Sequence, residues 1–187
     1  MLKINEEVPE FETRAYVDGV FKTLKLSDYK GKWVAVVFYP ADFTFVCPTE
    51  LEDLQKHYEE FKKLGAEILS VSKDTEFVHK AWHDNSPAIG TVKYPMLADP
   101  TGKLCQMFGT YDESDGLSLR GTFLIDPDGN LKTIEIHNND IGRSAKELLR
   151  KVQAAKFVRE HDGQVCPASW EPGSDTLTPG EDLVGKI

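Results

Sequence analysis

The hydrophobic positions of the chain fall into two kinds of segment. Residues 32–40 and 66–72 are nearly continuous runs of β-branched, aromatic and other apolar residues, which predicts strands buried on both faces of a sheet. Between them, apolar residues recur at helical spacing from Pro48 to Leu64, and Gly65 ends the predicted helix. Another helix is predicted from Thr75 to about His83. Strands and helices therefore alternate along this part of the chain.

Two hairpins and a late helix complete the predicted elements. Asp18-Gly19 and Asp128-Gly129 each separate two strand-like runs, and Asp-Gly is a strong hairpin signal. Ser144 and Glu147 have the spacing of a capping box, which predicts a helix from there to about Arg159. Strand–helix–strand alternation with a late hairpin predicts an α/β sandwich, with helices flanking a mixed central sheet.

The character of the sequence changes after His161. The last 26 residues contain three prolines and four glycines and show no helical period. Disorder is the usual outcome for such a composition, but Cys166 and Trp170 are unusual residues for a disordered tail. We therefore predict a domain over residues 1–160 and an ordered C-terminal arm over 161–187. Fully extended, the arm would span roughly 80 Å, enough to reach a neighbouring subunit.

Composition and charge narrow the class of protein. The chain of 187 residues is 40% apolar and 28% charged, which suits one soluble globular domain. A net charge of -9 argues against nucleic acid and anionic membranes as partners. No apolar run reaches the roughly 20 residues of a membrane span, and the N-terminus lacks the pattern of a secretory signal. Three cysteines are too few for a disulfide-stapled scaffold, so we predict a cytoplasmic protein.

Cys47 is the first candidate for chemistry. It follows the strand 32–40 and precedes Pro48, a residue suited to the first helical position, so it should stand at a helix N-terminus. The thiolate is the nucleophilic form of cysteine, and the free N–H groups and dipole of a helix start favour an anion. Thr44 supplies a nearby hydroxyl, and Pro40 can shape the loop. An inert buried cysteine is the alternative.

Three reactions of such a thiolate can be compared. Disulfide exchange of the Cys-x-x-Cys type fails because the required position holds Glu50. Amide hydrolysis needs a histidine base, and none of the five histidines stands in an obvious Cys-His motif. Cleavage of an O–O bond needs only the thiolate and donors that stabilise charge on the peroxide oxygens. The residues are best suited to that third reaction.

At this point the sequence resembles a known family. Pro40, Thr44 and Cys47 fit the Pro-x-x-x-Thr-x-x-Cys signature of the peroxiredoxins. The segment QVCPASW around Cys166 resembles the resolving-cysteine segment of the typical two-cysteine class. PADFTFVCPTEL and the ending DLVGKI are similar to the bacterial alkyl hydroperoxide reductase C branch. The resemblance runs from about residue 3 to the end, and implies a thioredoxin-like fold with an N-terminal extension and thiol-dependent reduction of hydrogen peroxide and alkyl hydroperoxides.

The resemblance also implies residue roles. Cys47 is the peroxidatic nucleophile, whose sulfenic acid Cys166 of the partner subunit resolves as an intersubunit disulfide. Thr44 is the hydroxyl partner, Pro40 shapes the loop, and Arg120 fixes thiolate and peroxide. A permanent charge on a rigid fork of donors suits Arg120 to this role, although it could be a surface residue that ends a loop. Arg143 is a supporting arginine by resemblance.

The sequence and its resemblance to the family also predict cofactors and partners. The chain has no glycine-rich phosphate loop or dinucleotide fingerprint, so we predict no bound cofactor or metal. Electrons are expected from an external disulfide reductase, either an NADH-dependent flavoprotein or thioredoxin. The resemblance implies homodimers that close into a decamer ring, with 43–45 and 77–78 at the contact between dimers. A chaperone-like holdase activity of the oligomer is the alternative function.

Two other features are interpreted as structural. Cys105 stands beside Leu104 on a plausible short helix, which favours core packing over redox chemistry. His79 and His83 are spaced i, i+4 and could form a metal pair, but no third ligand stands at a useful spacing. We therefore place these two histidines on a solvated helix face.

Overall fold

One mixed sheet forms the centre of the molecule. In the computed structural model, which describes residues 2–186, seven strands lie in the order β2-β1-β5-β4-β3-β6-β7. The strands are β1 (Glu12–Val17), β2 (Val20–Lys25), β3 (Trp33–Phe38), β4 (Ala66–Ser72), β5 (Met96–Ala98), β6 (Arg120–Ile125) and β7 (Leu131–His137). The pairs β3/β4 and β4/β5 are parallel and the other pairs are antiparallel. The predicted mixed sheet and both predicted hairpins are confirmed; the three-residue β5 was not predicted.

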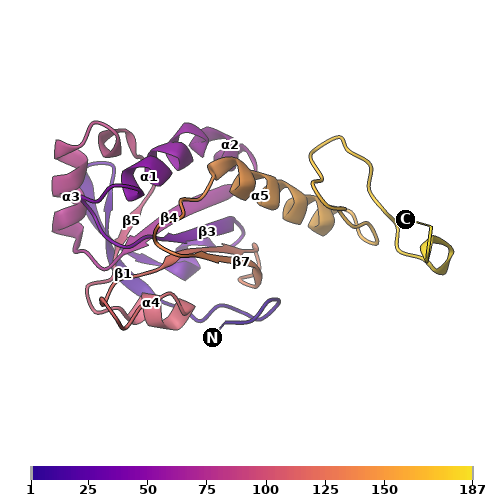
Figure 1. Cartoon of the computed structure of the whole chain (residues 1–187), viewed down its shortest axis with the longest axis horizontal. Coiled ribbons are helices and arrows are strands. Elements are labelled where there is room, and N and C mark those ends of the chain that lie inside the picture. The colour runs from indigo at the N-terminus through magenta and orange to yellow at the C-terminus, as the bar shows by residue number, and fades with distance from the viewer. Residues whose placement is uncertain (1, 187) are drawn as a thin grey trace.

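Helices cover both faces of this sheet. The helices are α1 (Cys47–Lys56), α2 (Tyr58–Lys63), α3 (Glu76–Asn85), α4 (Lys103–Phe108) and α5 (Ala145–Glu160), with short 3-10 helices η1 (Leu26–Tyr29), η2 (Ile89–Thr91) and η3 (Glu181–Leu183). Figure 1 shows α1, α2 and α5 on one side of the sheet and α4 on the other. Trp82 of α3 belongs to the same buried cluster as the residues of α1, α2 and α5. The chain therefore has an α/β architecture with a core on each face of the sheet.

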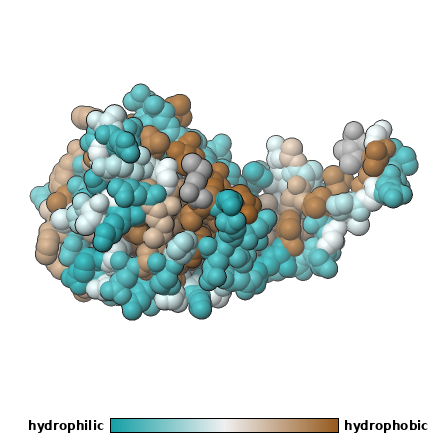
Figure 2. Space-filling view, turned by 90° about the horizontal axis from the view of Figure 1, so that it is seen from below, coloured by the Kyte–Doolittle hydropathy of each residue, from teal (hydrophilic) through white to brown (hydrophobic). Residues whose placement is uncertain are grey.

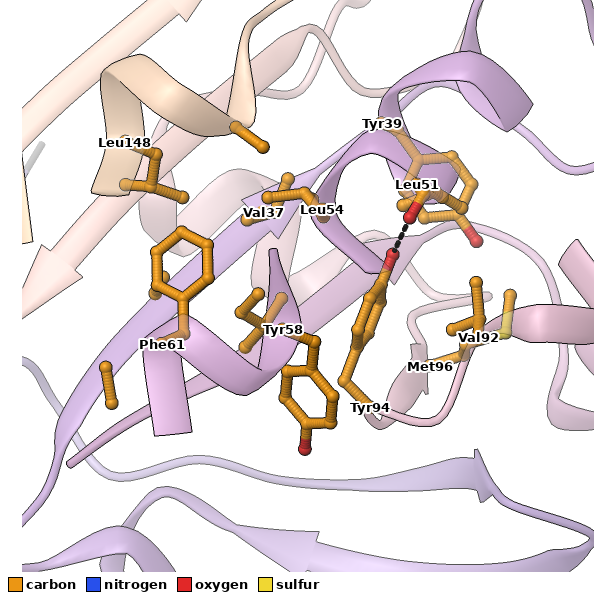
Figure 3. Close-up of a cluster of buried hydrophobic side chains, with 14 of the residues drawn as sticks. Val37, Tyr39, Leu51, Leu54, Tyr58, Phe61, Val92, Tyr94, Met96 and Leu148 are labelled. Atoms are coloured by element: carbon orange, nitrogen blue, oxygen red, sulfur yellow. Dashed lines mark hydrogen bonds between the residues drawn. The ribbon is translucent and has the colours of Figure 1, made fainter. Parts of the chain in front are cut away.

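The core on the α1 side fixes the position of the helix that begins at Cys47. Figure 3 shows its labelled side chains converging from β3, α1, α2, α5 and the segment before β5. Within it, the hydroxyl of Tyr94 donates to the backbone carbonyl of Leu51 over 2.7 Å. This bond ties the middle of α1 to the chain that enters β5, and the apolar packing around it holds the helix against the sheet.

The helix predicted from Pro48 to Leu64 is two helices. His57 interrupts it with φ -101° and ψ 2°, and its N–H donates to the carbonyl of Leu54, three residues back, over 3.2 Å. Leu54 and Tyr58, on either side of the break, are both buried. Hydrophobic spacing did not reveal the break, because a one-residue interruption leaves the apolar side chains on the core side.

The predicted capping box at the start of α5 is wrong. Ser144 is the N-cap residue, with φ -110° and ψ 128°, but its side chain makes no capping hydrogen bond. Instead, the N–H of Ala145 donates to Oδ2 of Asp53 on α1 over 2.8 Å. A carboxylate from another helix therefore satisfies a free N–H at the start of α5, a contact that local sequence does not encode.

The C-terminal segment is tied to the end of α5. Val165 and Leu177 exchange two backbone hydrogen bonds, of 2.9 and 3.1 Å, which close a loop. Inside that loop Trp170 is buried, with its ring centroid 4.9 Å from that of Phe157 on α5. Figures 1 and 2 show this arm projecting clear of the body, at the end of α5 that points away from α1. Met1 and Ile187, which the predicted domain and arm include, lie outside the described residues.

Candidate active site

The loop between β3 and α1 carries three of the predicted site residues. Pro40 is buried two residues after the end of β3. The hydroxyl of Thr44 donates to the carbonyl of Ala41 over 2.8 Å and closes a tight turn. At the top of this turn Phe43 has φ 56°, in the left-handed region that residues other than glycine rarely adopt. Cys47 follows as the first residue of α1, with Pro48 second, so the predicted helix-start position of the cysteine is confirmed.

Arg120 lies beside the cysteine. It opens β6, which pairs with β3, and is only 3% exposed. Its Nη1 lies 3.4 Å from the fully buried sulfur of Cys47, and its Nε donates to the carbonyl of Asn139 over 2.9 Å. The alternative of a surface arginine is therefore wrong. A permanent cation with further donors therefore faces the buried sulfur.

Glu50 joins the two arginines, and sequence reasoning missed it. One carboxylate oxygen accepts from Nη1 of Arg120 over 2.7 Å. The carboxylate also accepts from Nε and Nη2 of Arg143 over 2.9 and 3.1 Å, and from its backbone N–H over 2.8 Å. The available signal was its place on the helix, three residues after Cys47, which puts both on one helical face. The predicted supporting residue Arg143 thus contacts Glu50 rather than the sulfur.

The electrostatics of the site leave one positive charge in excess. Burial by itself would raise the pKa of Glu50, but the hydrogen bonds and charge of Arg143, with the charge of Arg120, lower that pKa below its ordinary value. Glu50 is therefore ionised at neutral pH and balances one of the two guanidinium groups. The remaining charge, in a buried site next to the sulfur, favours an anion there.

Cys166 lies elsewhere in the described chain. It belongs to the arm, and its sulfur is 3.8 Å from the carbonyl of Ala154 on α5. It lines a groove of about 540 Å³ that also includes Arg150 and Val165. Burial raises the pKa of the Cys166 thiol, and the charge of Arg150 opposes that shift. Within one chain the structure does not bring Cys166 to Cys47.

The two features interpreted as structural have different outcomes. Cys105 is fully buried on α4, as predicted, and burial with the nearby charge of Asp99 raises the pKa of its thiol to about 12. The prediction of a solvated face for His79 is wrong, because the side chain is fully buried. Its Nδ1 lies 2.8 Å from Oδ2 of Asp42, in the loop before Cys47. A buried acid in that loop is a contact that the i, i+4 spacing could not reveal.

A thioredoxin-like sheet with a buried cysteine at a helix start, facing a buried arginine, defines the class of the thiol peroxidases. The profile of the AhpC/TSA family matches residues 4–134, and that of the C-terminal domain of 1-Cys peroxiredoxin matches residues 154–186. The chain belongs to the AhpC/TSA family and is a thiol-dependent peroxidase.

Known proteins match nearly the whole chain. Alkyl hydroperoxide reductase C of Amphibacillus xylanus is 55% identical, with all of both chains covered. The crystal structure of Enterococcus faecalis AhpC is 50% identical, covers 89% of this chain and 100% of its own, and superposes with a TM-score of 0.86. The reduced 2-Cys peroxiredoxin of Plasmodium vivax is 35% identical, with 96% and 94% covered and a TM-score of 0.92. The predicted thioredoxin-like fold and peroxidase class are confirmed. Among residues 2–186, no helix is long and apolar enough to cross a membrane.

Proposed function

We propose that Cys47 is the peroxidatic nucleophile that reduces hydrogen peroxide and alkyl hydroperoxides. The observation that carries this proposal is the 3.4 Å approach of Arg120 Nη1 to the buried Cys47 sulfur at the start of α1. The thiolate attacks one peroxide oxygen, the S–O bond forms and the O–O bond breaks, leaving a sulfenic acid. The departing hydroxide or alkoxide takes a proton and leaves as water or an alcohol.

Each of the surrounding residues has its own proposed role in this reaction. Arg120 donates toward sulfur and peroxide, where charge develops as the O–O bond breaks. Thr44 commits its proton to the carbonyl of Ala41, so its oxygen can accept a hydrogen bond from the peroxide hydroxyl. Pro40 shapes the loop, and Arg143 acts through Glu50, which holds the guanidinium of Arg120 in place.

Cys166 of the partner subunit is proposed to resolve the sulfenic acid. Its thiol condenses with the sulfenic acid, the S–S bond forms and water leaves. Because Cys47 is buried in the first turn of α1, that turn must open before the two Cα atoms come within roughly 7 Å. The intersubunit disulfide then needs two electrons from an external disulfide reductase, either an NADH-dependent flavoprotein or thioredoxin. Reconstitution with each donor decides between these two.

The domain boundary, the assembly and the location of the protein are also part of this proposal. Residues 1–160 form the peroxidase domain and 161–187 the arm that carries Cys166. β7 is an edge strand with Ile134 and Ile136 partly exposed, which suits edge-to-edge pairing of two sheets into a homodimer. Exposed aromatic residues in the 43–45 turn and at the start of α3 suit closure of five dimers into a decamer. A cytoplasmic location stays a prediction from cysteine usage.

Peroxide consumption by cysteine variants tests the proposed roles. Wild-type protein should form one disulfide per peroxide consumed, and Cys47→Ser should abolish consumption. Cys166→Ser should consume one peroxide per chain and stop at the sulfenic acid, whereas Cys105→Ser should behave as wild type. Arg120→Lys, which keeps a charge but loses the fork, should slow the peroxide step by about 10²-fold.

Several outcomes would reject the proposal. Peroxide consumption that persists in Cys47→Ser would show that Cys47 is not the nucleophile. A disulfide between Cys47 and Cys166 of the same chain would show that the partner subunit does not supply the resolving cysteine. Suppression of aggregation by the oligomer, with no peroxide consumed, would favour the holdase alternative.

A further inference from the structure

Gly121 follows Arg120 at the start of β6 and takes part in no step of the proposed chemistry. The pairing of β6 with β3 covers residues 122–125, whereas residues 120 and 121 pair with β7. The N–H of Gly121 donates to the carbonyl of Leu119 over 3.0 Å, and the N–H of Leu119 donates to the carbonyl of Thr110 over 2.7 Å. The segment that joins α4 to β6 therefore helps to hold this end of the strand.

Gly121 packs against buried side chains at a distance that only a glycine permits. Successive residues of a strand point to opposite faces of the sheet, so Arg120 points toward Cys47 and residue 121 toward the face that α4 covers. On that face a Cβ atom at residue 121 would overlap the methyl carbon of Thr110 and would lie 2.8 Å from the ring edge of Phe123. Carbon atoms do not pack that closely, so any larger residue must displace something.

The two neighbours of Gly121 are themselves fixed. Thr110 is fully buried, its N–H donates to the carbonyl of Cys105 over 2.9 Å, and its hydroxyl accepts from that of Ser118 over 2.9 Å. The ring of Phe123 packs edge-on against a phenylalanine ring of α4, with centroids 4.9 Å apart. Because a packed interior yields little, extra volume at residue 121 should move the backbone of β6 rather than these side chains.

The backbone of Gly121 connects this packing to both arginines of the site. Its carbonyl accepts from Nη1 of Arg143 over 2.8 Å, and its peptide nitrogen is bonded to Arg120. Nη1 of Arg120 lies 3.4 Å from the sulfur of Cys47 and 2.7 Å from a carboxylate oxygen of Glu50. A shift of residue 121 away from α4 would therefore change the distances on which the proposed chemistry depends.

We propose that Gly121 is a positioning residue for peroxide reduction. Through its close contact with the methyl group of Thr110, it sets the distance between the guanidinium of Arg120 and the sulfur of Cys47. The inference rests on the proposed function of Cys47 and Arg120. It extends that function to a contact on the opposite face of the sheet, which touches neither the sulfur nor the peroxide.

Gly121→Ala tests the contact by overfilling it. The second-order rate constant with hydrogen peroxide should fall at least about tenfold, because Arg120 is displaced from the sulfur. In Arg120→Lys protein the same change should cost less than about threefold, because the guanidinium fork that it displaces is already absent. A substitution that only weakened the fold would reduce the rate by the same factor in both backgrounds.

Thr110→Ser tests the contact from the other side. It removes the methyl group and keeps the hydroxyl, so the rate constant should fall by about threefold as the end of β6 loses its support. Combining it with Gly121→Ala moves a methyl group from residue 110 to residue 121, where the new carbon takes nearly the place of the lost one. The double variant should be at least about threefold faster than Gly121→Ala, which independent effects would not give.

Ile125→Val is the matched control. Ile125 lies at the other end of β6, is buried, and belongs to the same core cluster as Phe123. The change removes one buried carbon from that cluster without touching the contact of Gly121. Its peroxide rate constant should stay within about twofold of wild type, because a packing loss in β6 does not by itself displace Arg120.

Several results would overturn the inference. A folded Gly121→Ala with the wild-type peroxide rate, or with an equal loss in Arg120→Lys protein, would reject a positioning role. If Gly121→Ala does not fold, Thr110→Ser decides in the same way: a wild-type rate, or a loss that persists equally in Arg120→Lys protein, would reject it. A double variant no faster than Gly121→Ala would exclude the methyl contact as the cause. Wild-type protein that consumes no peroxide would count against the proposed function instead.

Discussion

At the scale of single residues, Glu50 links the two arginines of the site. Its buried carboxylate receives hydrogen bonds from both arginines, although nothing in the proposed chemistry requires it to touch peroxide. A carboxylate in this place fixes the direction of the Arg120 fork and offsets part of the buried positive charge. The position of the Arg120 guanidinium beside the Cys47 sulfur therefore depends on Glu50, a residue for which the sequence indicated no role.

Glu50→Gln should weaken both activity and stability. Removal of one partner of a buried ion pair costs about 3 kcal/mol of unfolding free energy, and misplacement of Arg120 should slow peroxide reduction at least about tenfold. Urea unfolding and stopped-flow kinetics measure the two effects. Glu52→Gln, on the same helix but in an exposed pair with Lys56, should change neither by more than the experimental scatter.

The same variant should alter the dependence of stability on pH. The pKa of Glu50 is lower in the folded state than its ordinary value of 4.5, so its contribution to stability is fully present above that pH. As the pH falls from 4.5 toward the folded-state pKa, the wild type should lose this contribution. Glu50→Gln should lack that part of the acid loss; identical acid profiles for the two proteins would contradict the prediction.

Cys105 should be chemically silent in the folded protein. Burial raises the pKa of its thiol to about 12, and it has no exposed surface. In the variant that combines Cys47→Ser with Cys166→Ser, iodoacetamide should label no thiol at pH 8 until urea is added. Rapid labelling in buffer alone would show that α4 opens in the native state.

At the scale of elements, the start of α5 depends on a neighbouring helix. The N–H of Ala145 donates to Asp53, whereas the side chain of Ser144 makes no capping bond. Asp53→Ala should therefore cost about 1 kcal/mol of unfolding free energy, and Ser144→Ala less than about 0.5 kcal/mol. Urea titrations at one protomer concentration compare the two variants. A larger loss of unfolding free energy in Ser144→Ala than in Asp53→Ala would show that Ser144 caps the helix after all.

At the scale of the whole molecule, exposed aromatic side chains predict assembly. Phe45 is 91% exposed, Phe43 57% and Phe77 63%. Phe77 also packs on Phe21, with ring centroids 5.2 Å apart, so the patch reaches the N-terminal hairpin. Aromatic residues gathered on a protein surface mark an interaction site.

Phe45→Arg should divide the proposed decamer into dimers. A charge placed in an apolar contact has no partner there, whereas pairing of β7 edges does not involve this residue. Sedimentation velocity of the reduced protein at micromolar concentration measures the change. Val184→Arg, at an exposed position in the arm, is the control and should leave the decamer intact. Wild-type protein that sediments only as a monomer would contradict the assembly itself.

The sequence by itself determined the alternation of the longer strands and helices, both hairpins and the place of Cys47 at a helix start. It could do so because hydrophobic periodicity, Asp-Gly turns and the position of a proline act through neighbouring residues. Its motifs also indicated the peroxidase class. Tertiary structure alone decided the partner of the α5 start, the arginine clamp of Glu50 and the burial of His79. Each of these depends on contacts between residues far apart in the chain: Glu50 and Arg143 are 93 positions apart, and Asp42 and His79 are 37. Local patterns place a residue on a helix face or strand, but the packing of elements determines which charge lies opposite it.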